Sequence, residues 1–290
     1  MKDLIYFNQI NPRNKNLVGN KAFRLAELAK VGIRIANFFI IPSPVFDKIL
    51  ENKELQSLKA DLIFYGKSNL DKNLAKELEI LKEINLAISR FKFPQRFQKQ
   101  ILKSFDKLNT DKVAIRSSAT CEDQANSSFA GQFESYLSVL KDQVFEAIEK
   151  CFQSVFKEQV LMYCLYHKVD FSAIKMAVIV QKMIKAEKGG VIFTNDVFEG
   201  SNNLVIEATK GLGENVVSGR VNSQRIIFSK IDKRPIEGVI GFEKPVLSLK
   251  EAKKFFQIGL KVEKVFKQPQ DIEWAVKKDK IYILQSRPIT

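Results

Sequence analysis

Apolar side chains recur every three or four residues through much of the first 110 positions. Two such stripes are Leu74, Leu78, Leu81, Ile84 and Ile88, and Phe97, Ile101, Leu102, Phe105 and Leu108. Because this spacing places the side chains on one face of a helix, it predicts amphipathic helices that pack onto a core. An earlier helix is predicted from about Lys21 to a stop at Gly32, and another with Ser43 as its N-cap and Pro44 in its first turn.

Short apolar runs in the rest of the chain predict β-strands. They lie at residues 33–41, 113–115, 133–140, 176–180, 191–194, 204–208, 225–229, 271–276 and 280–287. A capping box formed by Ser248 and Glu251 predicts one more helix before the last two strands. Helices dominate the first part of the chain and strands the second, which predicts an α+β fold with two lobes at residues 1–175 and 176–290.

The composition is that of a globular protein of ordinary hydrophobicity. Of the 290 residues, 45% are hydrophobic and 28% charged, and the 13 Gly and 8 Pro are too few for a collagen-like or disordered chain. No apolar run approaches the roughly 18 residues that span a bilayer, and the first residues lack the apolar core of a secretory signal. Three widely spaced cysteines suit a reducing compartment better than a disulfide framework. We therefore expect a cytoplasmic protein without a membrane partner.

The net charge of +14 first indicates a nucleic-acid partner, but its distribution argues against one. Residues 1–110 carry +9, residues 111–220 carry −2 and residues 221–290 carry +7. The excess comes from lysines scattered along predicted helices, without an Arg-rich block. A solvated Lys-rich surface is therefore the favoured interpretation, and nucleic-acid binding ranks last among the functions considered.

Several common catalytic chemistries are disfavoured by the residue types. His167 is the one histidine of the sequence, and a structural or exposed role is favoured for it over a catalytic one. Cys164 and His167 have metal-ligand spacing, but a zinc site needs two further ligands, and no other Cys or His lies nearby. The sequence also lacks a Walker A motif, a dinucleotide fingerprint and the Gly-x-Ser-x-Gly nucleophile motif.

Arg116 and the hydroxyl groups that follow it are the first candidate for chemistry. Arg116 stands at the predicted end of the strand 113–115 and is followed by Ser117, Ser118 and Thr120. A guanidinium beside hydroxyls and exposed backbone N–H groups can hold a polyphosphate. The alternative, an arginine paired with a carboxylate beneath the sheet, is equally compatible with these residue types.

The last predicted hairpin carries the second candidate. In its second strand, the side chains expected to alternate onto one face are Ile281, Ile283, Gln285 and Arg287. Glu273 in the first strand faces Gln285 only if the turn has an odd number of residues, and we expect three, residues 277–279. A carboxylate and a carboxamide oxygen close together suit Mg²⁺, and Arg287 would then reach a phosphate beside the metal. An exposed polar strand face is the alternative, and it is favoured when the hairpin is taken alone.

Beyond these two candidates, a series of short motifs runs in order along nearly the whole chain. They occupy residues 19–25, 113–120, 122–123, 128–134, 180–183, 190–194, 206–208, 211–214, 217–220, 269–275 and 283–290. The series resembles the ATP-binding domain of the phosphoenolpyruvate synthase, pyruvate phosphate dikinase and rifampicin phosphotransferase family. This resemblance implies an ATP-grasp fold of two lobes, with ATP and Mg²⁺ in the cleft between them.

The resemblance also implies roles for individual residues. Lys21 and Arg116 would hold the phosphates, and Gly131 with Ser135 would lie in the loop that closes over them. Arg287 joins Lys21 and Arg116 as an implied catalytic residue at the transferring phosphates. The residues implied at the adenine end are Gln181 and, through their backbone, Met183 and Ile184. The implied ligands of Mg²⁺ are Glu273 and Gln285.

The implied reaction transfers the β-phosphoryl group of ATP to a histidine and releases AMP and phosphate. The phosphohistidine and final-acceptor domains of the family are not among the 290 residues, so we expect a phosphohistidine-domain partner or further domains to supply the histidine. Two alternatives stay open: direct phosphorylation of a small molecule, as by an antibiotic-modifying relative, and ATP binding without turnover. The second rests on residues 19–22, which hold fewer glycines than the family motif. Residues 220–248 also form a shorter segment than the family usually has.

Overall fold

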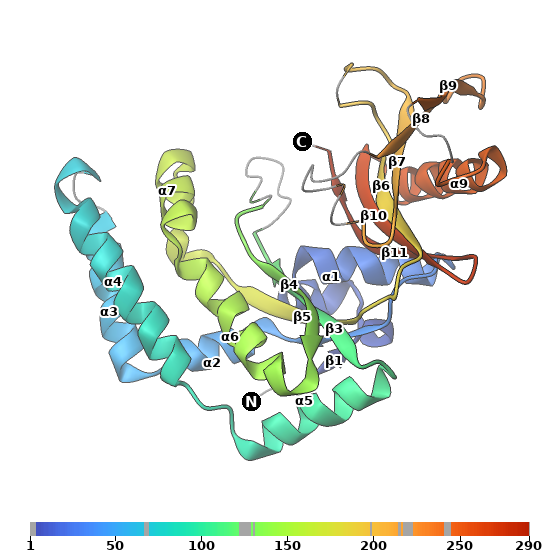
Figure 1. Cartoon of the computed structure of the whole chain (residues 1–290). Coiled ribbons are helices and arrows are strands. Elements are labelled where there is room, and N and C mark those ends of the chain that lie inside the picture. Colours follow the sequence, from blue (N-terminus) through green and yellow to red (C-terminus); the bar gives the residue numbers. More distant parts are fainter. Residues whose placement is uncertain are drawn as a thin grey trace. The chain divides into compact units, whose positions relative to one another are not determined.

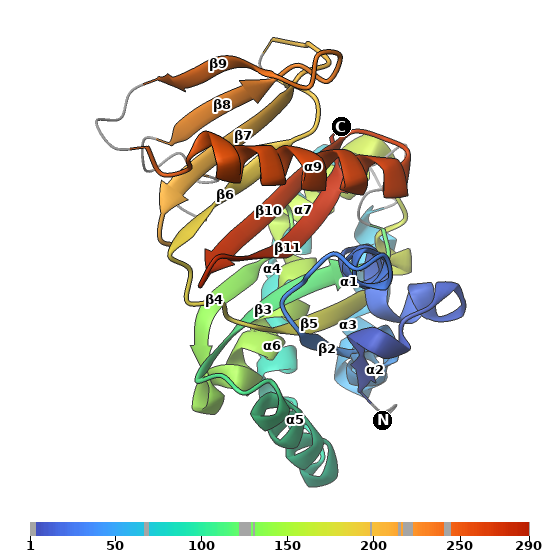
Figure 2. The same ribbon diagram turned by 90° about the vertical axis from the view of Figure 1, so that its right-hand side faces the viewer.

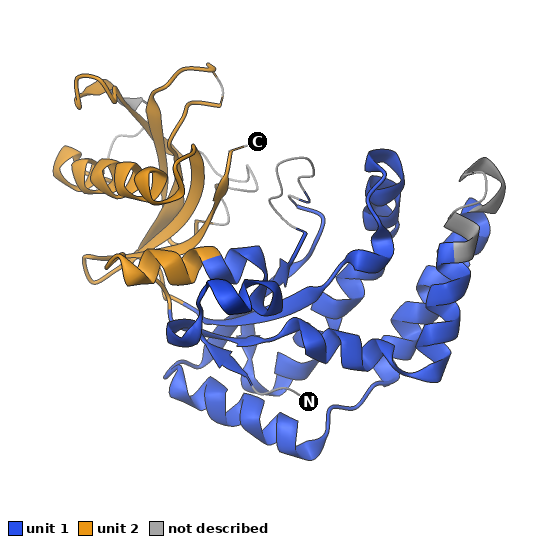
Figure 3. Ribbon diagram, turned by 180° about the vertical axis from the view of Figure 1, so that it is seen from behind, with its two compact units in different colours: residues 1–23, 37–183 blue, residues 24–36, 184–290 orange. Residues whose placement is uncertain are grey.

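The computed structural model describes residues 4–66, 70–121, 129, 131–197, 199–213, 216, 223–240 and 245–289 (Figures 1 and 2). The motif residues 122–123, 128, 130, 214, 217–220 and 290 lie outside the described residues. Packing divides the chain into two compact units (Figure 3). Unit 1 is Met1–Phe23 with Asn37–Met183, and unit 2 is Arg24–Ala36 with Ile184–Thr290. None of the helices in the described ranges is long and apolar enough to cross a membrane.

Unit 1 combines a five-stranded antiparallel sheet with most of the helices (Figure 1). The strands lie in the order β1-β2-β5-β3-β4. They are β1 (Ile5–Tyr6), β2 (Phe38–Ile41), β3 (Lys112–Ala119), β4 (Ser135–Leu140) and β5 (Met176–Lys182). The α-helices of unit 1 are α2 (Ser43–Leu50), α3 (Lys53–Gly66), α4 (Leu70–Arg90), α5 (Gln95–Lys107), α6 (Val144–Gln153) and α7 (Glu158–His167). Helix α1 (Lys15–Lys30) contributes its first residues to unit 1 and its last to unit 2.

The core of unit 1 lies on one face of this sheet, beneath the amphipathic helices. On that face β3 contributes Val113 and Ile115, and β5 contributes Val178 and Val180. Helix α6 packs against both strands. The two predicted apolar stripes are confirmed as core, with these members buried: Leu81, Ile84, Ile88, Phe97, Ile101, Phe105 and Leu108.

Unit 2 is a six-stranded antiparallel sheet in the order β11-β10-β6-β7-β8-β9, with helix α9 across one face (Figure 2). Its elements are β6 (Lys188–Phe193), β7 (Leu204–Lys210), β8 (Gln224–Phe228), β9 (Pro235–Ile240), α9 (Leu249–Phe266), β10 (Gln270–Lys277) and β11 (Lys280–Pro288). Under α9 the rings of Phe255 and Trp274 lie 4.2 Å apart between centroids, and both side chains are buried. The α+β class expected from the sequence is confirmed by these two units.

Two local predictions near the start of the chain are wrong. Residues 33–41 do not form one strand: β2 holds only Phe38–Ile41, whereas Ile35 makes an isolated parallel bridge with Ile283. The run is interrupted because the chain passes from unit 2 into unit 1 after Ala36. Ser43 is not an N-cap either, since Pro42 holds that position and the Ser43 hydroxyl donates to the carbonyl of Asn16 at 3.1 Å.

The two units also differ in extent from the lobes expected at residues 1–175 and 176–290. Strand β5 belongs to unit 1 because it pairs with β2 on one side and β3 on the other. Residues 24–36 belong to unit 2, where the carbonyl of Arg34 accepts the backbone N–H of Ile283 at 2.9 Å. A segment distant in sequence therefore completes unit 2, which sequence order alone does not indicate.

The predicted capping box at the start of α9 is confirmed. The Ser248 hydroxyl accepts the N–H of Glu251 at 3.3 Å, and the Glu251 carboxylate accepts the N–H of Ser248 at 2.9 Å. The Lys188 ammonium donates to the same carboxylate at 2.6 Å. Burial acts to raise the pKa of Glu251, but the hydrogen bonds from Lys188 and Ser248 outweigh it and lower the pKa below its usual value.

A pH-dependent contribution to stability follows from this lowered pKa. A carboxylate whose pKa is lower in the folded state stabilises the fold above its unfolded pKa, and that stabilisation is lost as the pH falls through the folded value. Glu251→Gln is therefore expected to reduce the free energy of unfolding by about 1 kcal/mol at pH 7 and by less below pH 4. Urea unfolding at both pH values measures this. Glu79→Gln is the control, because Glu79 makes an exposed pair with Lys76 at 3.2 Å; equal losses in the two variants would contradict the prediction.

Candidate functional site

Strand β3 carries its polar residues inside the sheet. The sequence predicted a strand at 113–115 that ends at Arg116, but β3 runs over Lys112–Ala119. Pairing with β5 continues to Ala119, opposite Met176, and this extends the strand through the polar stretch. Arg116 therefore lies in the middle of a strand, and its side chain is 8% exposed.

The register of the sheet brings three predicted site residues together. Arg116 lies opposite Ser135 on β4 and opposite Ile179 on β5. Gln181 follows two residues later on β5, and it is 1% exposed. Because side chains alternate between the faces of a sheet, Arg116, Ser135 and Gln181 share the face opposite to the apolar core. A guanidinium, a hydroxyl and a carboxamide on one face can bind a polar, anionic ligand.

Lys21 lies on α1 just after a sharp change of backbone direction. Gly19 leaves the helical conformation, with φ +75° and ψ 170°. A Cβ atom at Gly19 would lie 2.0 Å from the carbonyl oxygen of Ser118 on β3, so the position accepts no side chain. The Ser118 hydroxyl bridges the two sides of the kink: it donates to the carbonyl of Val18 at 2.8 Å and accepts the N–H of Ala22 at 3.2 Å. The start of the helix is thus seated on β3, two residues from Arg116.

The second position of the thinned glycine motif needs no glycine in this structure. Asn20 is buried, and it is not among the described residues with a positive φ. The Nζ atom of Lys21 lies 3.5 Å from the Ser117 hydroxyl oxygen, at the long limit of a hydrogen bond. Gly19 alone therefore supplies the conformation from which the helix carrying Lys21 begins.

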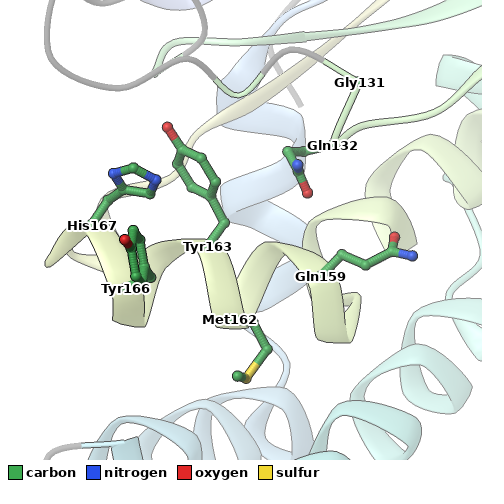
Figure 4. A pocket seen from close by; sticks show the side chains of 7 residues that line it. All are labelled: Gly131, Gln132, Gln159, Met162, Tyr163, Tyr166 and His167. Carbon is green, nitrogen blue, oxygen red and sulfur yellow. The ribbon is translucent and has the colours of Figure 1, made fainter.

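Gly131 occupies the turn that leads into β4, with φ +75°, and beyond its chain neighbours no described residue has an atom within 4 Å of the position that a Cβ would take there. Next to it lies a pocket of about 700 Å³ (Figure 4). Its lining residues are Gly131, Gln132, Gln159, Met162, Tyr163, Tyr166 and His167. None of the described lining residues is a Lys or Arg, and this set does not match the chemistry of a polyphosphate. His167 is exposed and its ring lies 4.2 Å from that of Tyr163, which agrees with the exposed role expected for it.

The segment predicted at the adenine end coincides with the change of unit. Met183 is the last residue of unit 1, and its N–H donates to the carbonyl of Lys112 at 3.2 Å. Ile184 is the first residue of the following part of unit 2, where it packs with Ala36 and Ala275. Each residue is thus anchored in its own unit.

The terminal hairpin places Glu273 directly opposite Gln285. The three-residue turn expected at 277–279 is wrong, because Lys277 pairs with Lys280 and the turn has two residues. Those two residues, Lys278 and Asp279, have φ values of 49° and 58°, as a tight hairpin turn of type I′ requires. A change of register between Glu273 and Trp274 nevertheless places Glu273 opposite Gln285, so that the two side chains share a face as expected.

The change of register also corrects the expected face of β11. Trp274 pairs with Ile283 and Glu273 with Gln285, so Leu284 is an extra residue in β11, a β-bulge. Because paired residues point to the same side, Ile283 lies with buried Trp274, whereas Gln285 lies with Glu273 on the other face. Ile281 and Ile283 therefore do not share a face with Gln285 and Arg287, contrary to the prediction.

Arg287 is held by a partner that the sequence reasoning did not assign. Its Nε and Nη2 atoms donate to one carboxylate oxygen of Asp271 at 2.8 and 2.7 Å. The two residues lie opposite each other, one pair beyond Glu273 and Gln285. The signal was present in the sequence, since Asp271 alternates onto the face of Glu273, but the cross-strand pairing depends on the bulge.

The donor set of the hairpin suits a small hard cation. Glu273 offers carboxylate oxygens and Gln285 a carboxamide oxygen, and Gln285 is 8% exposed. Among the described residues no group of three or more His, Cys, Asp or Glu side chains is placed to hold a metal ion. Two protein oxygens fit Mg²⁺, because this ion keeps several waters and takes its other ligands from phosphates.

Comparisons with known proteins cover the whole chain. Residues 15–245 and 239–290 match the family described as pyruvate phosphate dikinase, AMP/ATP-binding domain. The chain is 32% identical to the probable phosphoenolpyruvate synthase of Methanothermobacter thermautotrophicus, an alignment that covers 100% of the chain and 46% of that protein. For the phosphoenolpyruvate synthase of Pyrococcus furiosus, the identity is 29% over 98% of the chain and 43% of that protein.

Two further comparisons complete this set. The rifampicin phosphotransferase of Bacillus subtilis is 30% identical over 98% of the chain and 35% of its own length. The chain thus spans less than half the length of these three relatives. Among solved structures, a D-alanine–D-alanine ligase from Bacillus anthracis aligns with a TM-score of 0.40 and 11% identity, over 93% of this chain and 56% of that one.

The contact between Gly19 and β3 can be tested against a matched glycine. Gly19→Ala is expected to lower the free energy of unfolding by about 3 kcal/mol or more, because the new methyl group overlaps the Ser118 carbonyl. Gly32→Ala is the control: its φ of +77° is nearly the same, but beyond the chain neighbours of Gly32 no described residue has an atom within 4 Å of the new Cβ. The control should cost only the left-handed conformation, about 1–2 kcal/mol. Urea unfolding of both variants measures these losses of unfolding free energy. Equal losses would contradict the role assigned to the close contact between Gly19 and Ser118.

Proposed function

Because the chain belongs to the family of pyruvate phosphate dikinase AMP/ATP-binding domains, we propose that it is the nucleotide-binding part of an ATP-dependent phosphotransferase. It transfers the β-phosphoryl group of ATP to a histidine on another domain or chain, with release of AMP and phosphate. Atoms balance when one water molecule is consumed for each ATP. The observation that carries the proposal is the cross-strand pair Glu273–Gln285 beside the Asp271–Arg287 pair.

Unit 1 supplies contacts for the phosphates and the adenine in this proposal. Lys21 and Arg116 bind phosphate oxygens. The close contact of Gly19 with Ser118 supports this, because it holds the helix that carries Lys21 against the strand that carries Arg116. Ser135 adds a hydroxyl from the position opposite Arg116. Gly131 precedes it in the loop that closes over the phosphates, whose turn has the positive φ that glycine favours.

At the other end of the nucleotide, the Gln181 carboxamide accepts a hydrogen bond from the adenine edge through its oxygen and donates one to it through its NH₂ group. It lies on the same sheet face as Arg116, which supports a single ligand that reaches both residues. The backbone of Met183 and Ile184 completes this end. Backbone N–H and C=O groups suit an adenine ring because it presents one donor and one acceptor side by side.

Unit 2 supplies the metal ligands and one cation. Glu273 and Gln285 hold Mg²⁺, which when bound neutralises phosphate charge and orients the polyphosphate. Arg287 contacts the transferring phosphates, and Asp271 fixes the plane of its guanidinium through Nε and Nη2. In phosphoryl transfer most of the catalysis comes from positioning and charge neutralisation, and these residues provide both.

The metal site predicts a Mg²⁺-dependent affinity for ATP. Glu273→Gln is expected to weaken ATP binding about tenfold in the presence of Mg²⁺ and to leave the Mg²⁺-free affinity unchanged, because only the metal ligand is altered. Isothermal titration calorimetry with and without Mg²⁺ measures both. Asp279→Asn is the control, since it removes the same charge from the exposed turn of the same hairpin. The metal site would be contradicted if both variants lost the same ATP affinity, or if the wild type bound ATP equally well with and without Mg²⁺.

The proposed reaction predicts AMP as its nucleotide product. The probe partner is the part of the Methanothermobacter relative that this chain does not cover. With that fragment present, ATP should yield AMP and phosphate in equal amounts, together with an acid-labile phosphoryl group on the fragment. Chromatography of the nucleotides follows the reaction, and mixtures without the fragment serve as controls. Formation of ADP without AMP would instead support direct phosphorylation, and tight ATP binding with no product would support a non-catalytic module.

A further inference from the structure

Arg24 lies in the part of α1 that belongs to unit 2, and its guanidinium is engaged on several sides. Its Nε atom donates to the carbonyl oxygen of Ser286 at 3.1 Å. Its Nη2 atom donates to the side-chain oxygen of Gln270. The guanidinium carbon lies 3.8 Å from the centre of the Phe266 ring, at the end of α9. Stacking on an aromatic ring together with two directed hydrogen bonds fixes the plane of the guanidinium.

The two acceptors of Arg24 belong to a connected, buried network. The Ser286 hydroxyl also donates to the Gln270 side-chain oxygen, at 2.9 Å. The Gln270 amide group donates to the carbonyls of Gln268 and Pro269 at 3.1 and 2.9 Å. Gln270 is 0% exposed and Ser286 is 1% exposed. Arg24 is the charged member of this network, and hydrogen bonds to a charged donor are stronger than neutral ones.

This network lies directly behind the proposed metal and phosphate ligands. Ser286 stands between Gln285 and Arg287 in β11, and Gln270 precedes Asp271 in β10. Side chains alternate between the faces of the hairpin, so Gln270 and Ser286 point away from the face of Gln285 and Arg287. Arg24 therefore hydrogen-bonds to the end of the hairpin from the face opposite to Gln285 and Arg287.

We infer that Arg24 is a positioning residue that sets the geometry of Gln285 and Arg287 without touching nucleotide or metal. This inference rests on the proposed function, because it holds that the network positions the residues that we propose to bind Mg²⁺ and phosphate. Groups that hold metal ligands in place through the surrounding hydrogen bonds change metal affinity about 10- to 100-fold when removed. Lysine cannot replace Arg24, since its single ammonium group lacks the planar fork that spans the Ser286 carbonyl and the Gln270 side chain.

The test compares three variants of the full chain. Arg24→Ala is expected to weaken Mg²⁺-dependent ATP binding about tenfold and Arg24→Lys by a smaller factor, and both variants are expected to leave Mg²⁺-free binding unchanged. Arg34→Ala is the matched control: Arg34 is exposed and lies 5.7 Å from the ring of Tyr282, farther along the same strand from Arg287. Calorimetry with and without Mg²⁺ gives the affinities. If Arg24 were merely structural, its loss would lower the melting temperature while the folded protein kept the wild-type response to Mg²⁺.

Hydrogen exchange supplies a readout that needs no nucleotide. Arg24→Lys is expected to increase amide exchange in peptides that cover residues 270–273 and 285–288, whereas Arg34→Ala should leave these peptides unchanged. If the wild type bound ATP equally well with and without Mg²⁺, the proposed function would be refuted. The exchange data would still test whether Arg24 stabilises the end of the hairpin. Normal exchange and a wild-type response to Mg²⁺ in the Arg24 variants would overturn the inference while the proposed function stood. If the alanine variant does not fold, the lysine variant carries both comparisons.

Discussion

One extra residue in β11 decides which side chains of the terminal hairpin face each other. The two-residue turn at Lys278 and Asp279 alone would pair Glu273 with Leu284, an apolar residue. The bulge at Leu284 shifts the register by one, so that Glu273 meets Gln285. Arg287 moves with it, since without the shift it would lie opposite Gln270 and not opposite Asp271. The proposed metal and phosphate ligands of unit 2 all depend on this single insertion.

The same bulge lets the hairpin serve two purposes on its two faces. Before the bulge, counted from the turn, Ile283 pairs with Trp274 and stays in the core beneath α9. After it, Gln285 and Arg287 face the other way, where the proposed function places Mg²⁺ and the phosphates, while Ser286 on the reverse face joins the network of Gln270. A regular strand of this sequence would place Ile283 on the same side as Gln285. The bulge thus keeps an apolar core and a polar ligand face on one short hairpin.

Helical periodicity and family motifs allowed much of the structure to be predicted. The stripes ending at Ile88 and Leu108 recur at helical spacing, and burial enforces that spacing in the folded chain. The capping box of Ser248 and Glu251 is a local signal, because all its hydrogen bonds lie within four residues. The motifs also led to the residues of the hairpin, independently of any knowledge of its register.

Non-local pairing explains what the sequence could not reveal. A three-residue turn at residues 277–279 would place Glu273 and Gln285 on the same face but two positions apart, whereas the two-residue turn with a bulge places them directly opposite each other. A shared face for Glu273 and Gln285 therefore does not determine which turn occurs. The length of β3 depends on β5, some 60 residues later, and the polar residues after Ile115 gave no sign that pairing continued. Residues 33–41 look like one apolar run, yet their two ends belong to different units.

The buried polar residues of the strands connect stability with function. Arg116 and Gln181 are nearly inaccessible in β3 and β5, positions from which apolar side chains would stabilise the sheet at least as well. Desolvation of a guanidinium usually offsets much of what its interactions contribute, so stability does not explain its presence there. Natural sequences depart from such local preferences mainly at functional sites. At Arg116 and Gln181, burial alone would favour apolar residues, and the family resemblance implies contacts with ATP at the same two positions. These two arguments are independent.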